Sequence, residues 1–339
     1  MVEFNRLRAF FSPRPLDAVG LPGYKMIGPR IATRAFANGR NGRIDNFGIG
    51  SCRAGGLTDI ACTERAGNED GLLLALRKFP GHEQLMISVA DGIGGHGGGE
   101  VASALALNAI AKYFCECVPA AYSHTAAVTQ AVVELAAWKA GHPELDKVAG
   151  TTLVSALANL RTGMVSLAHI GDARAYLLRG DDLFLLTRDD NYLGGYLGVF
   201  AGEDISPTFN ALIKILGPDP EAAYDRLKVP FGAGMSQLLH DVNFDYYNNE
   251  TFGGRICKAI GVGNQNGQPF QASLLELALK KGDILALMSD GVHDFIAFDP
   301  LRASMISSRR GTPLQIAEAI FSKLPVMGDN VTIAVYKQG

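Results

Sequence analysis

The chain of 339 residues has few cysteines and no long apolar run. Its five cysteines are an odd number, form no CxxC pair, and have no histidine at zinc-site spacing. This pattern excludes a disulfide-stapled domain and is typical of a reducing compartment. No run approaches the roughly 20 apolar residues that cross a bilayer, and the first residues lack a signal-peptide core. We therefore expect a cytoplasmic protein that does not enter a membrane.

Basic residues are scarce outside the first part of the chain. The formal net charge is −3. Residues 1–50 nevertheless hold eight Arg or Lys against Glu3, Asp17 and Asp45, so the remainder is net acidic. Nucleic-acid backbones are bound by clustered Lys and Arg. The charge distribution therefore argues against a nucleic-acid partner and favours sites for cations.

The composition divides the chain into an extension and one large domain. Residues 1–50 carry scattered Gly, Pro and Arg without a sustained period, which predicts a basic, partly ordered extension. Residues 51–339 have the short apolar runs of a compact fold, and 47% of the whole chain is hydrophobic. Within this domain, residues 193–254 are rich in Tyr, Asn and Gly and are too long for an ordinary loop.

Hydrophobic periodicity predicts an α+β fold. Apolar runs bounded by turn residues predict strands at 72–76, 85–91, 151–160, 164–172, 174–180, 182–187, 283–290 and 331–336. Neighbouring runs are separated by only a few residues, which favours hairpins and antiparallel sheets. Helical periodicity predicts helices at 100–118, 125–141 and 312–324, the last with Thr312 as its N-cap. We expect helices packed outside stacked antiparallel sheets.

Carboxylates recur where the predicted strands meet turns. The set comprises Glu69, Asp70, Asp91, Asp172, Asp290 and Asp329. One aspartate at a strand end is common because aspartate favours turns. Acids delivered by five separate segments, however, suit the oxygen coordination of Mg²⁺ and Mn²⁺. The pattern predicts a multi-carboxylate metal site.

Eight ordered stretches of the sequence resemble the metal-dependent protein serine/threonine phosphatases of type 2C, the PPM family. They are RAGNED (65–70), VADGIGGHGGGEVAS (89–103), GTTLV (150–154), HIGDARAYLLR (169–179), LTRDDN (186–191), KAIG (258–261), DILALMSDGVHD (283–294) and GDNVTIAV (328–335). They cover nearly all of residues 57–336 apart from 193–254, which would be an enlarged flap. The resemblance implies a sandwich of two antiparallel β-sheets with helices on both outer faces, an α-β-β-α arrangement.

The resemblance also implies which residues hold metal ions. Asp91 would bridge two Mg²⁺ or Mn²⁺ ions. Glu69 and the backbone carbonyl of Gly92 would complete one of them, and Asp290 and Asp329 the other. Asp172, with Asp290, would bind a third, weaker ion of the kind seen in bacterial relatives.

Four further residues take supporting roles in this resemblance. Arg65 would bind the substrate phosphate, because its planar guanidinium can donate two hydrogen bonds to phosphate oxygens. Asp70, His96 and Asn330 would lie behind the metal ligands, where Asp70 would orient waters on the metal ions. His96 is either a proton-transfer group or a hydrogen-bonding strut, and both readings stay open. Ile93 stands where many eukaryotic members have a histidine, which indicates the bacterial type.

The activity that the resemblance implies is hydrolysis of phosphoserine and phosphothreonine in proteins, through a water that bridges the two ions. The substrate would be a phosphoprotein, and a cognate Ser/Thr kinase the opposing partner. Two alternatives remain: a phosphohydrolase of the same fold acting on a small phosphorylated molecule, and a non-catalytic phosphopeptide-binding module. Retention of five converging acids argues against the second, because such a module has no need to keep them.

Overall fold

A computed structural model describes residues 31–37, 41–61, 67–79, 81–94, 98–117, 122–143, 149–190, 259–261, 271–324 and 328–339, together with Gln237 and His240. Only the backbone is described for 31–37 and for Phe79. No helix among these residues is both long and apolar enough to cross a bilayer.

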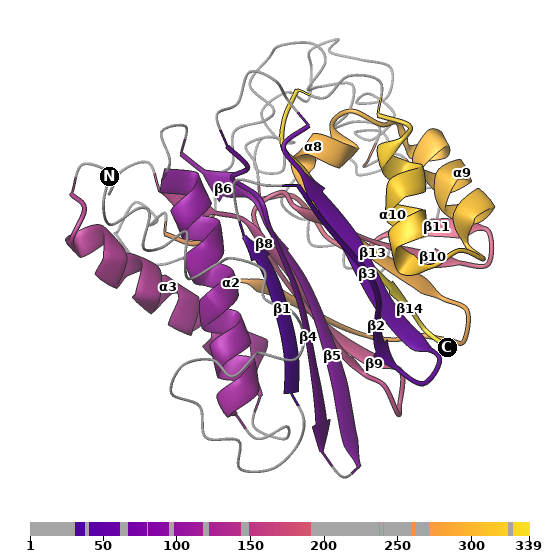
Figure 1. The fold of residues 1–339 in the computed structure, drawn as a ribbon, viewed down its shortest axis with the longest axis horizontal. Helices are drawn as coiled ribbons and strands as arrows, with labels where there is room; N and C mark the ends of the chain where they lie inside the picture. The colour runs from indigo at the N-terminus through magenta and orange to yellow at the C-terminus, as the bar shows by residue number, and fades with distance from the viewer. Residues whose placement is uncertain are drawn as a thin grey trace, which may run out of the picture.

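Two six-stranded antiparallel sheets face each other at the centre of the protein (Figure 1). The first has the order β1-β4-β5-β8-β9-β12, with strands Ile31–Ala37, Gly71–Phe79, His82–Ala90, Leu153–Asn159, Met164–Ile170 and Ser273–Ala278. The second has the order β11-β10-β13-β14-β3-β2, with strands Asp182–Leu185, Arg174–Arg179, Ile284–Met288, Val331–Lys337, Cys52–Asp59 and Gly42–Ile49. A short separate pair consists of β6 (Gly92–Ile93) and β7 (Gly150–Thr151).

Helices cover the outer face of each sheet. Helices α2 (Gly98–Glu116) and α3 (His124–Ala140) lie on the first sheet, and α9 (Phe298–Ser308) and α10 (Pro313–Phe321) on the second (Figure 1). A single-turn helix, α8 (Asp290–His293), follows β13 directly. The α-β-β-α arrangement expected from the sequence is confirmed. The expected start of α10 is confirmed as well, because Thr312 forms a capping box with Gln315.

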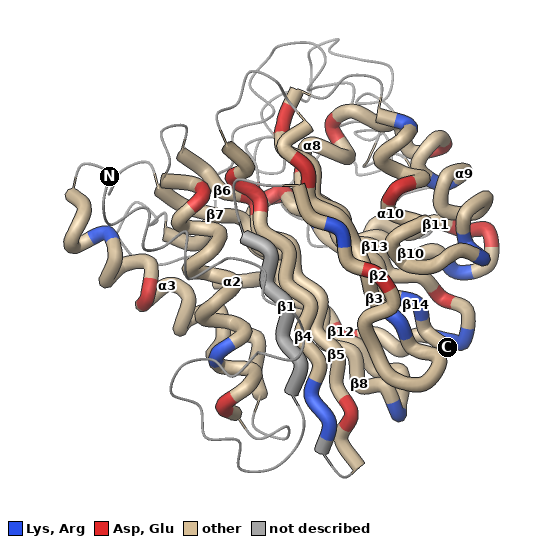
Figure 2. The backbone as a smooth tube through the Cα atoms, in the orientation of Figure 1, with Lys and Arg blue, Asp and Glu red and all other residues tan. Residues whose placement is uncertain are grey.

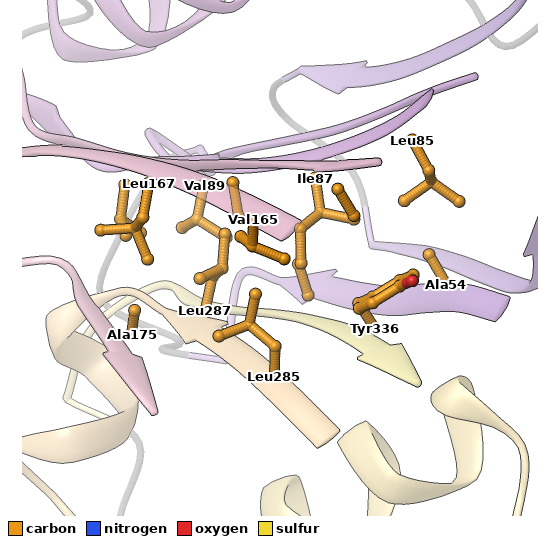
Figure 3. Packing of buried hydrophobic residues seen from close by; sticks show 14 of the residues in the cluster. Ala54, Leu85, Ile87, Val89, Val165, Leu167, Ala175, Leu285, Leu287 and Tyr336 are labelled. Atoms are coloured by element: carbon orange, nitrogen blue, oxygen red, sulfur yellow. The ribbon is translucent and has the colours of Figure 1, made fainter. Parts of the chain in front are cut away.

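The run LLLAL in β4 is apolar throughout because both faces of its sheet are covered. Successive side chains of a strand point to opposite faces. Leu72 and Leu74 accordingly pack between the sheets, while Leu73 and Ala75 pack beneath the helices. Figure 3 shows the inter-sheet layer, where Leu85, Ile87, Val89, Val165 and Leu167 face Ala54, Ala175, Leu285, Leu287 and Tyr336.

The first fifty residues supply more of the fold than the sequence predicts. Strand β1 pairs with β4 through seven residue pairs, and β2 pairs with β3, so each sheet takes an edge strand from before residue 50. The boundary predicted at residue 50 is therefore wrong as the start of the fold. Strand β2 hides its two-residue period because a bulge between Ile44 and Phe47 contains Asn46 at positive φ.

Strand β3 was also not predicted, because two adjacent glycines break its apolar pattern. Each glycine marks a close approach of backbone. A Cβ on Gly56 would lie 2.2 Å from the carbonyl oxygen of Ile333, and one on Gly55 would lie 3.0 Å from the Pro313 side chain. Glycine in this strand is what lets β14 and α10 pack closely on it.

Candidate metal centre

The predicted acids lie at one end of the two sheets because of strand register. In the β4–β5 pair Gly71 faces Ala90, so the next pair brings Asp70 opposite Asp91. In the β10–β13 pair Arg174 faces Met288, and two further steps bring Asp172 opposite Asp290. Figure 2 shows acidic segments at this end of the molecule, beside β6 and α8.

Asp91 is held through its backbone by two threonines. Its carbonyl oxygen accepts hydrogen bonds from Thr152 N and Thr151 Oγ1, both at 2.8 Å. Its own N–H donates to Thr152 Oγ1 at 3.1 Å. The GTT segment therefore fixes where β5 ends and leaves the Asp91 carboxylate for other partners.

Asp91 and Asp290 form a carboxylate pair. Burial raises the pKa of Asp91 well above its ordinary range, and Asp290, Asp70 and Asp329 raise it further. The Asp91 and Asp290 carboxyl groups lie close enough to interact directly. Two carboxylates this close repel each other when both are ionised, and bound cations would relieve that repulsion. Both residues are half-buried and remain open to solvent.

Asp70 lies deeper than its neighbours and is 1% exposed. Ser289 Oγ donates a 2.7 Å hydrogen bond to its Oδ2 atom. Burial nevertheless raises the pKa of Asp70 to about 7. The Ser289 hydrogen bond lowers this pKa, and the nearby charges of Asp290 and Asp329 raise it. Asp70 is thus more deeply buried than Asp91 and Asp290 and is held by Ser289.

Glu69 and Asn330 are joined across the two sheets. The side-chain oxygen of Asn330 accepts a 2.8 Å hydrogen bond from Glu69 N, while its amide group donates to Ile60 O at 3.0 Å. The Glu69 carbonyl accepts a 2.6 Å bond from Ser103 Oγ in α2. Asn330 is 1% exposed and immediately follows Asp329, so it fixes both acid-bearing segments.

Gly92 is required by the close approach of three backbone segments. A Cβ at this position would lie 2.3 Å from Gly99 O and 2.6 Å from Glu69 O. Any larger residue would push the start of α2 away from β6. The glycine thus allows the backbone after Asp91 to lie against both Glu69 and the helix.

Asp172 differs from the other acids in its surroundings. It is 6% exposed, and its buried Oδ1 atom has no hydrogen-bond partner among the described residues. Burial raises its pKa well above the ordinary range, and Asp290, Asp189 and Asp294 raise it further. An unsatisfied carboxylate oxygen of this kind is an acceptor that a cation can satisfy.

These residues have the chemistry of a site for hard divalent cations. They offer several carboxylates and a backbone carbonyl, which are ligands preferred by Mg²⁺ and Mn²⁺. Within the described ranges, no three His, Cys, Asp or Glu side chains form a ready-made metal cage. Asp91 and Asp290 nevertheless lie close together, and a divalent cation could neutralise the repulsion between their carboxylates.

The family model for protein phosphatase 2C matches residues 68–314, which is most of the chain. The chain belongs to the protein phosphatase 2C family.

Named relatives in the 2C family agree with this assignment. The serine/threonine protein phosphatase PstP of Mycobacterium tuberculosis is 38% identical over 133 residues, which are 38% of this chain and 23% of PstP. The serine/threonine phosphatase Stp of Listeria innocua is 29% identical over 167 residues, which are 46% of this chain and 65% of Stp. The chain thus spans about a quarter of the first and just under two thirds of the second.

A solved structure of the PstP catalytic domain, in complex with two manganese ions, has the same fold. It covers 84% of this chain and 97% of that domain with a TM-score of 0.55 and 23% identity. At that identity the likeness establishes the fold alone.

Two of the predicted 2C site residues, Arg65 and His96, lie outside the described residues. Sequence reasoning in turn missed Ser289, Thr151 and Thr152, which hold the predicted acids in place. A signal was available for each of them: Ser289 directly precedes Asp290, and the two threonines lie within the GTTLV stretch.

Proposed function

We propose that this protein is a metal-dependent phosphatase that hydrolyses phosphoserine and phosphothreonine in proteins. The observation that carries the proposal is the Asp91–Asp290 pair, with Asp70 and Asp329 close enough to raise the pKa of Asp91, in a chain of the protein phosphatase 2C family. The two manganese ions in the PstP structure support Mn²⁺ or Mg²⁺ as the cofactor.

The proposed ligands divide into two sets around Asp91. Glu69 and the carbonyl of Gly92 belong to one ion, and Asp290 and Asp329 to the other. When bound, the two ions would supply a nucleophilic water at neutral pH and stabilise charge on the phosphoryl group. Asp172, whose buried Oδ1 atom lacks a partner, is proposed for a third ion together with Asp290.

The residues behind the ligands have the task of keeping them in place. Asp70 is held by Ser289, and Asn330 ties the Glu69 segment to the Asp329 segment. Fixed ligands let the site stabilise the transition state without reorganising during the reaction. We assign phosphate binding to Arg65 and a place near the ligands to His96, as their motif positions suggest.

The biological setting is proposed on the same family grounds. The substrate would be a phosphoprotein, a cognate Ser/Thr kinase would oppose the reaction, and the enzyme would act in cytoplasmic signalling. The phosphatase domain would include the two edge strands before residue 50 as well as residues 51–339, with an enlarged flap at about 193–254.

A phosphatase assay on the purified full chain tests the proposal. Hydrolysis of p-nitrophenyl phosphate should require added Mn²⁺ or Mg²⁺ and stop when EDTA is added. A panel of phosphoserine and phosphothreonine peptides should be hydrolysed faster than small phosphate esters. A preference for the small esters would indicate a phosphatase for small phosphorylated molecules. Folded protein that shows no metal-dependent hydrolysis would refute the proposed phosphatase activity.

A further inference from the structure

His240 is a buried side chain from a region in which little else is described. Between residues 190 and 259 the structure describes only Gln237 and His240. The His240 side chain is fully enclosed, with 0% exposure. Its ring lies edge-on to the rings of Tyr176 and Phe298, at centroid distances of 5.9 and 5.5 Å. A buried imidazole needs hydrogen-bond partners on both nitrogens.

Both ring nitrogens of His240 have partners, and these partners fix the proton. The Nε2 atom lies 2.8 Å from the carbonyl oxygen of Ile296, which can only accept, so Nε2 donates. The Nδ1 atom therefore accepts from the Tyr176 hydroxyl, 2.8 Å away. Burial, reinforced by the positive charge of Arg174, lowers the pKa of His240 well below its ordinary range, which keeps this neutral form.

The hydrogen-bonded chain continues from Tyr176 to an enclosed ion pair. Arg174 Nη1 donates to Tyr176 Oη at 3.4 Å. The same guanidinium binds Asp189 in a fork, with Nε to Oδ1 at 2.9 Å and Nη2 to Oδ2 at 2.7 Å. Arg174 is 0% and Asp189 6% exposed. Separating the pair would leave a buried charge without its partner, which is strongly destabilising. The ion pair therefore ties β10 to the segment that carries Asp189.

Asp172 lies in the bend just before this row of side chains. Arg174 and Tyr176 are two residues apart in β10 and so lie on one face of that strand. The Asp172 backbone carbonyl accepts a 3.1 Å hydrogen bond from His293 Nε2. Its Oδ1 atom has no hydrogen-bond partner within the structure. The position of this carboxylate thus depends on the backbone contact to His293 and on how β10 is held by the Arg174–Asp189 pair.

We propose that His240 is a positioning residue for Asp172, because it closes the chain His240–Tyr176–Arg174–Asp189 that fixes the strand end bearing the Asp172 carboxylate. The consequence for metal binding rests on the proposed function, in which Asp172 holds the weaker ion. Loss of His240 would leave the Tyr176 hydroxyl proton without its acceptor and Ile296 O without its Nε2 donor. The end of β10 would then loosen, and the ion at Asp172 would bind less tightly.

The test compares His240→Ala with His124→Ala in the full chain. His124 is a matched control because it is also a buried histidine, 4% exposed, bonded to Ser166 Oγ at 3.0 Å under the other sheet. Two measurements are made: amide hydrogen exchange of residues 172–176 without metal, and Mn²⁺ titration followed by the electron paramagnetic resonance signal of free Mn²⁺.

We expect His240→Ala to lose exchange protection in 172–176 and to weaken the weak class of Mn²⁺ sites by about tenfold or more, with the tight class changed by less than about twofold. His124→Ala should do neither. Tyr176→Phe interrupts the same chain with little change of volume, so it should give the same pattern and add little when combined with His240→Ala. It also serves as the test variant if His240→Ala does not fold.

Unchanged protection of 172–176 in the folded variants, or equal losses in the His124 control, would overturn the inference. Equal weakening of tight and weak Mn²⁺ sites would also overturn it, because that result indicates general destabilisation. If the wild-type protein bound no Mn²⁺, the proposed function would fail, and the exchange measurement alone would decide the role of His240.

Discussion

Ser289 and Asp70, separated by 219 positions in the chain, are joined by a 2.7 Å hydrogen bond between hydroxyl and carboxylate. The same Ser289 oxygen accepts a 2.9 Å bond from Thr332 N. One hydroxyl thus connects β13, β14 and the segment before β4, directly behind Asp290. All three residues are buried.

We expect Ser289→Ala to destabilise the protein by about 1–3 kcal/mol, because it leaves Thr332 N and the Asp70 carboxylate without this partner. Metal-dependent activity should fall about 10–100-fold, as is typical for groups that orient ligands. Denaturant unfolding and phosphatase assays measure the two effects.

Ser88→Ala is the control, since Ser88 is equally buried but bonds to Ser155 away from the acids. This variant should lose stability and keep its activity. Equal activity losses in both variants would refute a specific role for Ser289.

Asp290→Asn should abolish phosphatase activity and leave the fold intact. The amide keeps the size of the carboxylate but removes the negative charge proposed to hold two ions. It also relieves repulsion from Asp91, so the unfolding free energy should not fall. Activity and circular dichroism check both expectations.

Asp283→Asn is the matched control for Asp290→Asn. Asp283 is buried just before β13, opposite the end that carries Asp290, and is paired with Arg179. This variant should lose stability through the broken ion pair and keep its activity. An undiminished rate in Asp290→Asn would remove Asp290 from the proposed site.

Gly92→Ala should destabilise the protein by several kcal/mol and weaken Mn²⁺ binding, because the new Cβ would lie 2.3 Å from Gly99 O. Gly141→Ala provides the comparison. Gly141 ends α3 at φ −89° and has its nearest contact at 3.5 Å, so alanine should be neutral or stabilise by about 0.4–1 kcal/mol. Thermal unfolding and Mn²⁺ titration distinguish the two variants. A Gly92→Ala protein as stable as wild type would contradict the close packing described for β6 and α2.

The contribution of His124 to the stability of the metal-free protein should fall as pH decreases from 6.5 to 4. Burial lowers the pKa of His124 to about 4 from its ordinary 6.5. The unfolded chain therefore takes up a proton near pH 6.5 and the folded chain only near pH 4, so unfolding is favoured across that range. The loss contributed by this group is about 3 kcal/mol. The His124→Gln variant lacks this group. The difference in unfolding free energy between the variant and the wild-type protein should therefore change by about 3 kcal/mol between pH 6.5 and 4, as measured by urea unfolding at several pH values. Parallel profiles for the two proteins would contradict the assignment.

The sequence predicts the acids but not what holds them. Asp91 and Asp290 each end an apolar run before glycine, a local pattern that can be read without a structure. The partners Ser289 and Asp70 come together only through the register of strands far apart in the chain. His240 has no local pattern at all, since its burial depends on the rings of Tyr176 and Phe298. The edge strand β11 falls within the predicted run 182–187, whereas β2 and β3 escaped prediction because a bulge and adjacent glycines break their apolar patterns.

The edge strands also bear on where the chain can be shortened. A recombinant protein beginning at residue 51 would lack β1 and β2, which cover one side of β4 and of β3. The inner strands β4 and β3 would then become sheet edges with unpaired backbone N–H and C=O groups, the kind of edge along which strands of separate molecules can join. Shortened versions for expression should therefore begin before Ile31, so that both β1 and β2 are kept and neither β4 nor β3 becomes an exposed edge prone to aggregation.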